Sequence, residues 1–215
     1  MPEDGVTNID AETPSVAIAL FGNAGSSIWP YFSLSAEYAD GKADPLNRWS
    51  ERMGNELAMS LNGLALFPFG GPPHQPFLQW AKKAEALASS QIGMLIHPQY
   101  GLWHAYRFAI ALPVSAIEIS DDRRLLAPPN HRHPCNDCSS QACLSACPVN
   151  AFTEGNYDVE TCFRYLDATP DAICHQTGCQ ARTACPEGKS HLYQPTHAAF
   201  HMKKFVSALR KRYNK

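Results

Sequence analysis

Two stretches of sequence decide how this chain is organised: CNDCSSQACLSACP, from Cys135 to Pro148, and CHQTGCQARTACP, from Cys174 to Pro186. Together with Cys162 they contain all 8 cysteines of the 215-residue chain, so the part before Cys135 contains none. In a reducing compartment, a dense set of thiols is typical of metal binding rather than of disulfides. The sequence therefore predicts two parts with different chemistry, of which the second binds metal.

The spacing of the cysteines favours two iron–sulfur clusters. Four thiolates hold one 4Fe-4S cluster, so eight divide evenly into two. In the bacterial pattern C-x2-C-x2-C-x3-C-P, three close cysteines bind one cluster, and the fourth, followed by proline, binds the other. Applied here, this rule predicts a first cluster on Cys135, Cys138, Cys143 and Cys185, and a second on Cys147, Cys162, Cys174 and Cys179.

The gaps between the cysteines differ from that pattern, which leaves alternatives open. Four residues in place of two precede Cys143, and both gaps after Cys174 are two residues longer than in the pattern. Two structural zinc sites of four cysteines each, or one cluster with spare thiols, would also use these residues. Proline follows the last cysteine of each half, at Pro148 and Pro186, which favours the clusters because a zinc site does not need it.

Composition and charge place limits on the function. Hydrophobic residues make up 45% and charged residues 18% of the chain, and the formal net charge is −2. These values are typical of a globular protein and exclude a disordered chain, and they argue against nucleic acid as a partner. The polar, acidic N-terminus does not resemble a secretory signal, and no apolar run is long enough for a membrane span. We therefore expect a cytoplasmic protein without a membrane partner.

Apolar patterning outside the cysteine-rich part predicts alternating strands and helices. Asp44 is the expected N-cap of a helix that starts at Pro45, and Thr196 is the expected cap of a final amphipathic helix. Tyr106–Leu112 alternates in a way that predicts a strand packed on one face. The remaining expectations are strands at 15–21 and 64–69, helices at 45–61 and 77–89, an apolar run at 92–96 and a linker at 121–134.

Three segments carry a resemblance to a known group. YDVETCFRYL, from Tyr157 to Leu166, lies between the cysteine clusters as in the ferredoxin module of epoxyqueuosine reductases and reductive dehalogenases. IGMLIHPQYGLWHAYR, from Ile92 to Arg107, is similar to the cobalamin-binding domain that those enzymes share with the vitamin-processing CblC family. A helix that opens with Asp44, Pro45 and Leu46 is the third point of likeness.

The resemblance implies an α+β fold. Residues 1–128 would form a nitroreductase-like or CblC-like α/β sandwich that binds cobalamin, and 129–190 a small ferredoxin-like module with both clusters. Residues 191–215 would add the C-terminal helix. The same resemblance makes these residues the candidate cobalamin contacts: His97, Tyr100, Gly101, Trp103, Tyr106 and Arg107.

The first functional hypothesis is an oxidoreductase that passes electrons through two clusters to a bound cobalamin. The alternatives are a two-cluster electron carrier without catalysis, a flavin-dependent reductase, and an epoxyqueuosine-reductase-like enzyme. Epoxyqueuosine reductases carry an acidic proton donor before the second helix. In this chain, 67–77 contains no Asp or Glu, so His74 is the nearest titratable candidate. The expected partners are a corrinoid and an electron donor, either a small molecule or a redox protein.

Overall fold

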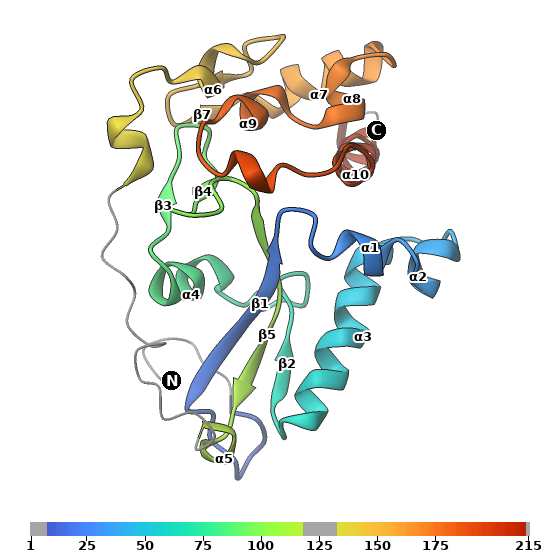
Figure 1. The fold of residues 1–215 in the computed structure, drawn as a ribbon. Coiled ribbons are helices and arrows are strands. Elements are labelled where there is room, and N and C mark those ends of the chain that lie inside the picture. Colours follow the sequence, from blue (N-terminus) through green and yellow to red (C-terminus); the bar gives the residue numbers. More distant parts are fainter. Residues whose placement is uncertain (1–7, 118–132, 214–215) are drawn as a thin grey trace. The chain divides into compact units, whose positions relative to one another are not determined.

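The computed structural model describes residues 8–117 and 133–213 and has a mixed α and β fold (Figure 1). It divides into two compact units, and each is described separately below. The first unit holds the described residues of Met1–Asn23, Ser27–Ala86 and Ala105–Pro129, and the second holds those of Ala24–Ser26, Leu87–His104 and Asn130–Lys215. Most of the linker expected at 121–134 lies outside the described residues.

The first unit is built on a three-stranded sheet with the order β1-β5-β2. Its strands are β1 (Ala17–Ala24), β5 (His104–Leu112) and β2 (Leu64–Leu66), and β2 pairs antiparallel to β5 with Leu64 opposite Ala111. All three strands expected here are therefore confirmed. β2 is shorter than the expected strand because it ends before Pro68, and proline cannot donate a ladder hydrogen bond.

The expectation that the strand at 106–112 packs on one face is wrong. β5 is the central strand and is paired along both edges, and both of its faces are covered as well, because 108–111 are all buried. Phe108 and Ile110 pack with Ala58 on one face, whereas Ala109 and Ala111 pack with Trp80 on the other. Figure 1 shows the two covering helices on opposite sides of the sheet, namely α3 (Pro45–Ser60) and α4 (Phe77–Ala84).

The helices of the first unit agree with the apolar patterning except at their ends. Asp44 precedes α3 as expected, but it has a left-handed conformation and its side chain makes no capping hydrogen bond. α4 ends at Ala84 instead of near Ser89, because Glu85 is extended. Gly54 lets α3 lie close to the sheet, since a Cβ there would come within 3.1 Å of the Phe108 ring. Three short helices complete the unit: α1 (Trp29–Phe32), α2 (Ala36–Ala39) and α5 (Val114–Ile117).

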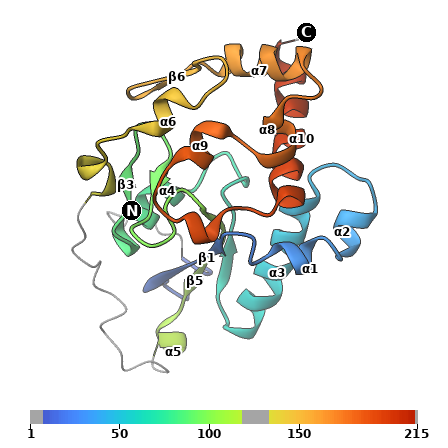
Figure 2. The ribbon, with the colours of Figure 1, turned by 45° about the horizontal axis from the view of Figure 1, so that its top comes forward.

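The second unit combines the hairpin of β3 (Ala88–Ser89) and β4 (Leu95–Ile96) with the cysteine-rich segment (Figures 1 and 2). A second hairpin pairs β6 with β7. The elements of the cysteine-rich segment are η2 (Pro134–Asp137), α6 (Ala142–Ser145), β6 (Phe152–Thr153), β7 (Asn156–Tyr157), α7 (Val159–Ala168), α8 (Ile173–Thr177), α9 (Gln180–Ala184), η3 (Lys189–His191) and α10 (Pro195–Tyr213).

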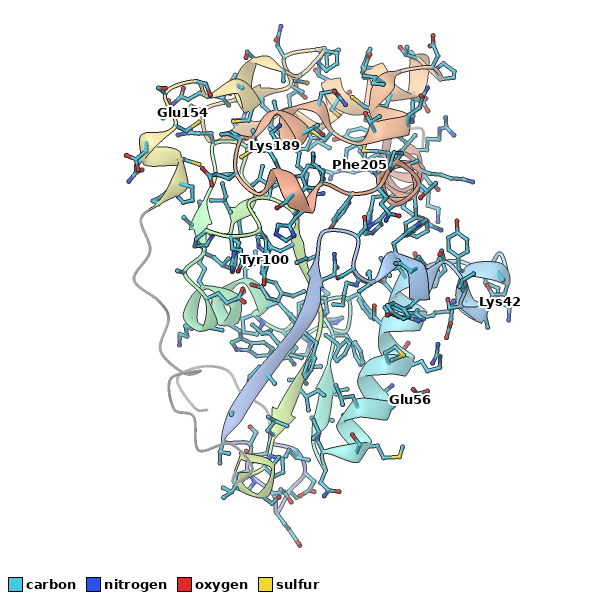
Figure 3. All side chains as sticks on the ribbon, viewed as in Figure 1. Lys42, Glu56, Tyr100, Glu154, Lys189 and Phe205 are labelled. Atoms are coloured by element: carbon cyan, nitrogen blue, oxygen red, sulfur yellow. The ribbon has the colours of Figure 1, made fainter. Side chains whose placement is uncertain are left out.

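The final amphipathic helix is confirmed as α10, which lies against α7 and α8. Met202, Phe205 and Leu209 of this helix pack on the core around Phe163 and Leu166 (Phe205 is labelled in Figure 3). Thr196 does not cap the helix, because α10 already begins at Pro195. Within 8–117 and 133–213, none of the helices is both long and apolar enough to cross a bilayer.

Candidate metal centre

Four cysteines of the second unit line one cavity. They come from three places in the chain: η2 and its following residue, α6, and the residue after α9. The cavity has about 410 Å³ of empty space, a volume that includes solvent at its open mouth. The four cysteines are Cys135, Cys138, Cys143 and Cys185, the same set that the spacing assigned to the first cluster.

The neighbours of Cys185 agree with this grouping. Cys185 lies 42 residues beyond Cys143, yet it is only 7% exposed and packs in one core with Cys135 and Cys143. Burial raises the pKa of the Cys185 thiol, and the nearby Cys143 and Cys135 add to that shift. Pro186, which directly follows Cys185, lines the same cavity.

The other four cysteines are neighbours of one another. Burial raises the pKa of the Cys162 thiol to about 11, and the nearby thiols of Cys179, Cys147 and Cys174 raise it further. Cys147 and Cys174 are themselves buried, at 8% and 7% exposed. The second set of the sequence analysis is thus also brought together, around the starts of α7, α8 and α9 and the residues after α6.

Hydrogen-bond donors surround these sulfur atoms. The backbone N–H of Ala151 donates to Cys147 Sγ at 3.4 Å. The backbone N–H of Gln180 donates to Cys174, and that of Arg182 donates to Cys179. The Tyr157 hydroxyl is hydrogen-bonded to Cys162. The sequence analysis assigned no role to this tyrosine. The Tyr157 phenol keeps its proton and donates it in this hydrogen bond. The bond therefore favours the thiolate form of Cys162, whose sulfur is the acceptor.

An apolar wall closes one side of the first cavity. Ile92, Ile96 and Leu102 line it, and they pack in the same core as Cys147 and Cys185. These three residues belong to Leu87–His104, which the sequence analysis had placed in the N-terminal domain. Residues 92–104 of the run that carries the CblC resemblance therefore belong to the cysteine-containing unit, and three of them line the cavity of the first group of thiols.

The donor set fits iron–sulfur clusters. Four thiols arranged around a cavity can each bind one iron at a corner of a 4Fe-4S cluster, and the surrounding N–H groups and apolar wall are features that set cluster potentials. Among the residues that the structure describes, no three His, Cys, Asp or Glu side chains form a group that could hold a single metal ion. Figure 3 shows sulfur atoms among the helices of this unit.

The candidate cobalamin residues of the second unit are engaged with protein groups. His97 Nδ1 accepts hydrogen bonds from the backbone N–H groups of Gln99 and Tyr100, at 2.9 and 3.1 Å. In a neutral imidazole, the single ring proton is then on Nε2. His97 could therefore bind cobalt through Nε2 only if that proton were lost. The Tyr100 ring stacks on His97, and a Cβ on Gly101 would overlap the Glu187 carbonyl oxygen (Tyr100 is labelled in Figure 3).

Trp103 is 2% exposed, and its ring is covered by the Arg182 guanidinium at 4.2 Å from the ring centre. Its Nε1 is one of two buried polar side-chain atoms without a hydrogen-bond partner in the described part of the chain. The indole is therefore packed within the protein and offers no open face to a corrin ring. Its orphaned N–H is the one feature of this set that points to a missing acceptor.

Tyr106 and Arg107 lie in the first unit, and both are engaged there. The Tyr106 hydroxyl donates to Glu85, and burial, with that carboxylate, raises the pKa of Tyr106. Arg107 donates to Asn47 Oδ1 at 2.8 Å and to Ser50 Oγ at 3.1 Å. The six candidates thus divide between the two units, and their contact with a cobalamin stays a prediction.

His74, the candidate proton donor, is exposed in the turn before α4. Its Nδ1 donates to the Gly70 carbonyl oxygen at 3.0 Å. It does not line the cavity of the first four cysteines. Its placement agrees with a solvated turn residue that stabilises its own loop.

A histidine pair in the second unit was not found from the sequence. His197 is 1% exposed, and its Nδ1 lies 3.0 Å from Ser26 Oγ. Ser26 Oγ accepts from the Gln194 N–H, so its own proton is free to donate to His197, whose Nε2 then faces His201 Nε2 at 3.0 Å. Burial lowers the pKa of His197 to about 3, and His201 and Arg182 add to the shift. His197 is therefore neutral near pH 7, and it links Ser26 to His201 in a hydrogen-bonded chain.

Comparisons with known proteins give two similar solved structures. No family model and no curated protein matches the chain. An epoxyqueuosine reductase with a modified tRNA stem loop aligns over 73% of this chain at 18% identity and a TM-score of 0.41. An epoxyqueuosine reductase from Bacillus subtilis aligns over 70% at 19% identity, also with a TM-score of 0.41. The aligned regions span 41% and 40% of those chains.

Proposed function

We propose that this chain is an iron–sulfur redox protein that holds two 4Fe-4S clusters and passes single electrons between a donor and an acceptor. The observation that carries the proposal is the grouping of the eight thiols into two sets of four, one of which lines a cavity with an apolar wall. The ligands of the first cluster are Cys135, Cys138, Cys143 and Cys185, and those of the second are Cys147, Cys162, Cys174 and Cys179.

The residues of the chain have three tasks in this function. The thiolates hold the irons, and burial keeps the pKa values of Cys162 and Cys185 high, so loading requires the loss of protons. The backbone N–H groups and Tyr157 donate hydrogen bonds to sulfur and stabilise the more negative state. Ile92, Ile96 and Leu102 exclude water from one side of the first set. Each cluster, when bound, takes up and returns one electron.

The chain order links the two sets. Cys143 belongs to the first and Cys147 to the second, with one turn of α6 between them. On the other side, α9 separates Cys179 from Cys185 in the same manner. Both connections are short and helical, which favours close clusters and hence electron exchange between them. Clusters held by these thiolates would supply one-electron chemistry between a donor, of the redox-protein or small-molecule class, and an acceptor.

Cobalamin is the acceptor that the sequence resemblance implies, and the CblC-like run supplies the wall of the first cavity. The contact of the six candidate residues with cobalamin stays a prediction, so we derive no step through cobalamin. Titration of the reconstituted protein with hydroxocobalamin tests this alternative. A saturable spectral shift would support a corrinoid enzyme. A protein that shows none, and no flavin fluorescence after denaturation, would be a two-cluster carrier.

Metal and sulfide analysis tests the proposal itself. The anaerobically reconstituted chain should be brown, absorb broadly near about 400 nm, and contain about eight irons and eight sulfides per chain. Cys138→Ala should lose about half of the iron, whereas Ser139→Ala, one residue further along on the exposed surface, should lose none. A colourless protein with two zinc ions would overturn the redox function.

A further inference from the structure

Ser90 is a buried serine with an unused hydroxyl. It lies directly after β3 and is 8% exposed. Its backbone is fully engaged in the turn to β4, because its N–H donates to the Met94 carbonyl at 2.8 Å and its carbonyl accepts from the Gly93 N–H at 3.0 Å. Among the described residues, its Oγ is one of two buried side-chain polar atoms that have no hydrogen-bond partner.

Such a hydroxyl is costly without an acceptor. Leaving a buried polar group unsatisfied costs roughly 1–3 kcal/mol, so an orphaned group in a folded protein points to a partner that binds there. Ser90 lines the same cavity as the first set of four thiols. Ile92, Ile96 and Leu102 give this cavity an apolar wall, and its other polar lining residues are Gln91, Gln141 and Glu187.

We propose that Ser90 donates its hydroxyl proton in a hydrogen bond to a sulfur atom of the first cluster and thereby raises the reduction potential of that cluster. This inference rests on the proposed function, and it names a residue outside the cysteine set. The reduced cluster carries one more negative charge than the oxidised cluster, so a donor at sulfur stabilises the reduced state more. Removal of the hydroxyl therefore makes reduction harder.

The adjacent serine provides a matched control. Ser89, the last residue of β3, precedes Ser90 in the chain but is exposed and does not line the cavity. Ser89→Ala makes the same chemical change one position away without touching the cavity. Ser90→Thr keeps a hydroxyl at the site, so it should retain the wild-type potential. Ser90→Ala removes it with little change in volume.

The test is an EPR-monitored redox titration of the anaerobically reconstituted full chain. Ser90→Ala should weaken reduction of one cluster about tenfold, a shift of about 59 mV to lower potential for a one-electron couple. The other cluster should keep its potential, and Ser89→Ala should leave both unchanged. Cys138→Ala identifies the affected signal, because it removes a ligand of the first cluster only.

Two negative outcomes have different meanings. If the wild-type chain takes up no iron and sulfide, the proposed function itself fails. If both clusters form, and Ser90→Ala and Ser89→Ala give the same potentials as wild type, the clusters stand and the role of Ser90 is overturned. A shift of the signal that survives in Cys138→Ala would also overturn it, because the hydroxyl would then act on the second cluster.

Discussion

The guanidinium of Arg182 lies 4.2 Å over the ring of Trp103 and donates two hydrogen bonds, at 3.0 and 2.6 Å, to the carbonyl of Leu102. Arg182 is in α9, between Cys179 and Cys185, so it lies between a ligand of each proposed cluster. Leu102 lines the first cavity. One side chain thus fixes the apolar wall to the helix that joins the two sets of thiols.

We predict that Arg182→Ala destabilises the protein by roughly 2–4 kcal/mol, because it removes charged hydrogen bonds and a cation–π contact. Arg182→Lys keeps the charge but loses the paired hydrogen bonds and the planar stacking. It should therefore retain only a small part of the stability that Arg182→Ala loses. Urea denaturation measures both. An unchanged midpoint in Arg182→Ala would show that the contact contributes little.

Gly101 is predicted to tolerate no side chain. It has a positive φ of 56°, and a Cβ would overlap the Glu187 carbonyl oxygen, two residues after Cys185. Gly93 also has a positive φ, of 78°, but a Cβ there has open space around it. Gly93→Ala should therefore cost about 1 kcal/mol for the backbone conformation alone, and Gly101→Ala several kcal/mol.

Thermal or urea unfolding compares the two alanine variants under the same conditions. Iron retention should also fall in Gly101→Ala, because the displaced chain carries a ligand of the first cluster. Equal losses of stability in both variants would show that only the positive φ matters and that the close approach to Glu187 does not.

Tyr157→Phe should lower the potential of the second cluster and leave the first unchanged. The hydroxyl is hydrogen-bonded to Cys162, and loss of a donor at sulfur favours the oxidised state. Tyr165→Phe is the control, since Tyr165 lies in the same region but packs toward the α7–α10 core. The EPR-monitored titration separates the two clusters. A shift in the first cluster alone would contradict the assignment of Tyr157.

The stability of the second unit should fall in mild acid because of His197. Its pKa is lowered to about 3 in the folded protein from a usual value of 6.5, so the unfolded chain binds the proton more readily. The full stability is present above pH 6.5 and is lost progressively as the pH falls toward 3. From pH 6.5 to 5 the loss should be about 2 kcal/mol.

Unfolding free energies at several pH values check this prediction. His197→Gln should reduce the pH dependence between 6.5 and 5, because glutamine has no proton to take up there. His74→Gln replaces an exposed histidine of the first unit and should leave the dependence as it is in wild type. A His197→Gln profile parallel to that of wild type would assign the acid sensitivity to other groups.

The sequence predicted the local elements of the first unit well, because apolar periodicity reports which face of an element is buried. The helix at 45–61 and the three strands were found in this manner. Apolar periodicity did not predict that both faces of the strand at 106–112 are buried. Phe108 and Ala109 lie on opposite faces, and each packs in a different hydrophobic core. The likeness of this unit to a CblC-like sandwich stays a prediction.

The cysteine sets could be predicted because metal ligands leave a strong chemical signature in spacing. The cavity wall could not, since Ile92 and Leu102 are ordinary apolar residues whose partners lie more than 30 residues away in the chain. Ser90 and Tyr157 carry no signal in a single sequence, because a serine after a short strand and a tyrosine before a helix are common. Their importance depends on what is packed around them.

Which thiols share a cluster is the central claim, and paired alanine variants test it most directly. Cys143→Ala with Cys185→Ala removes two ligands from the first cluster, so we predict about four irons per chain and a second cluster with its wild-type EPR signal and potential. Cys143→Ala with Cys147→Ala takes one ligand from each cluster and should disturb both signals. If the second pair instead leaves one wild-type cluster and the first pair disturbs both, the cysteines group by position in the chain and the account is contradicted.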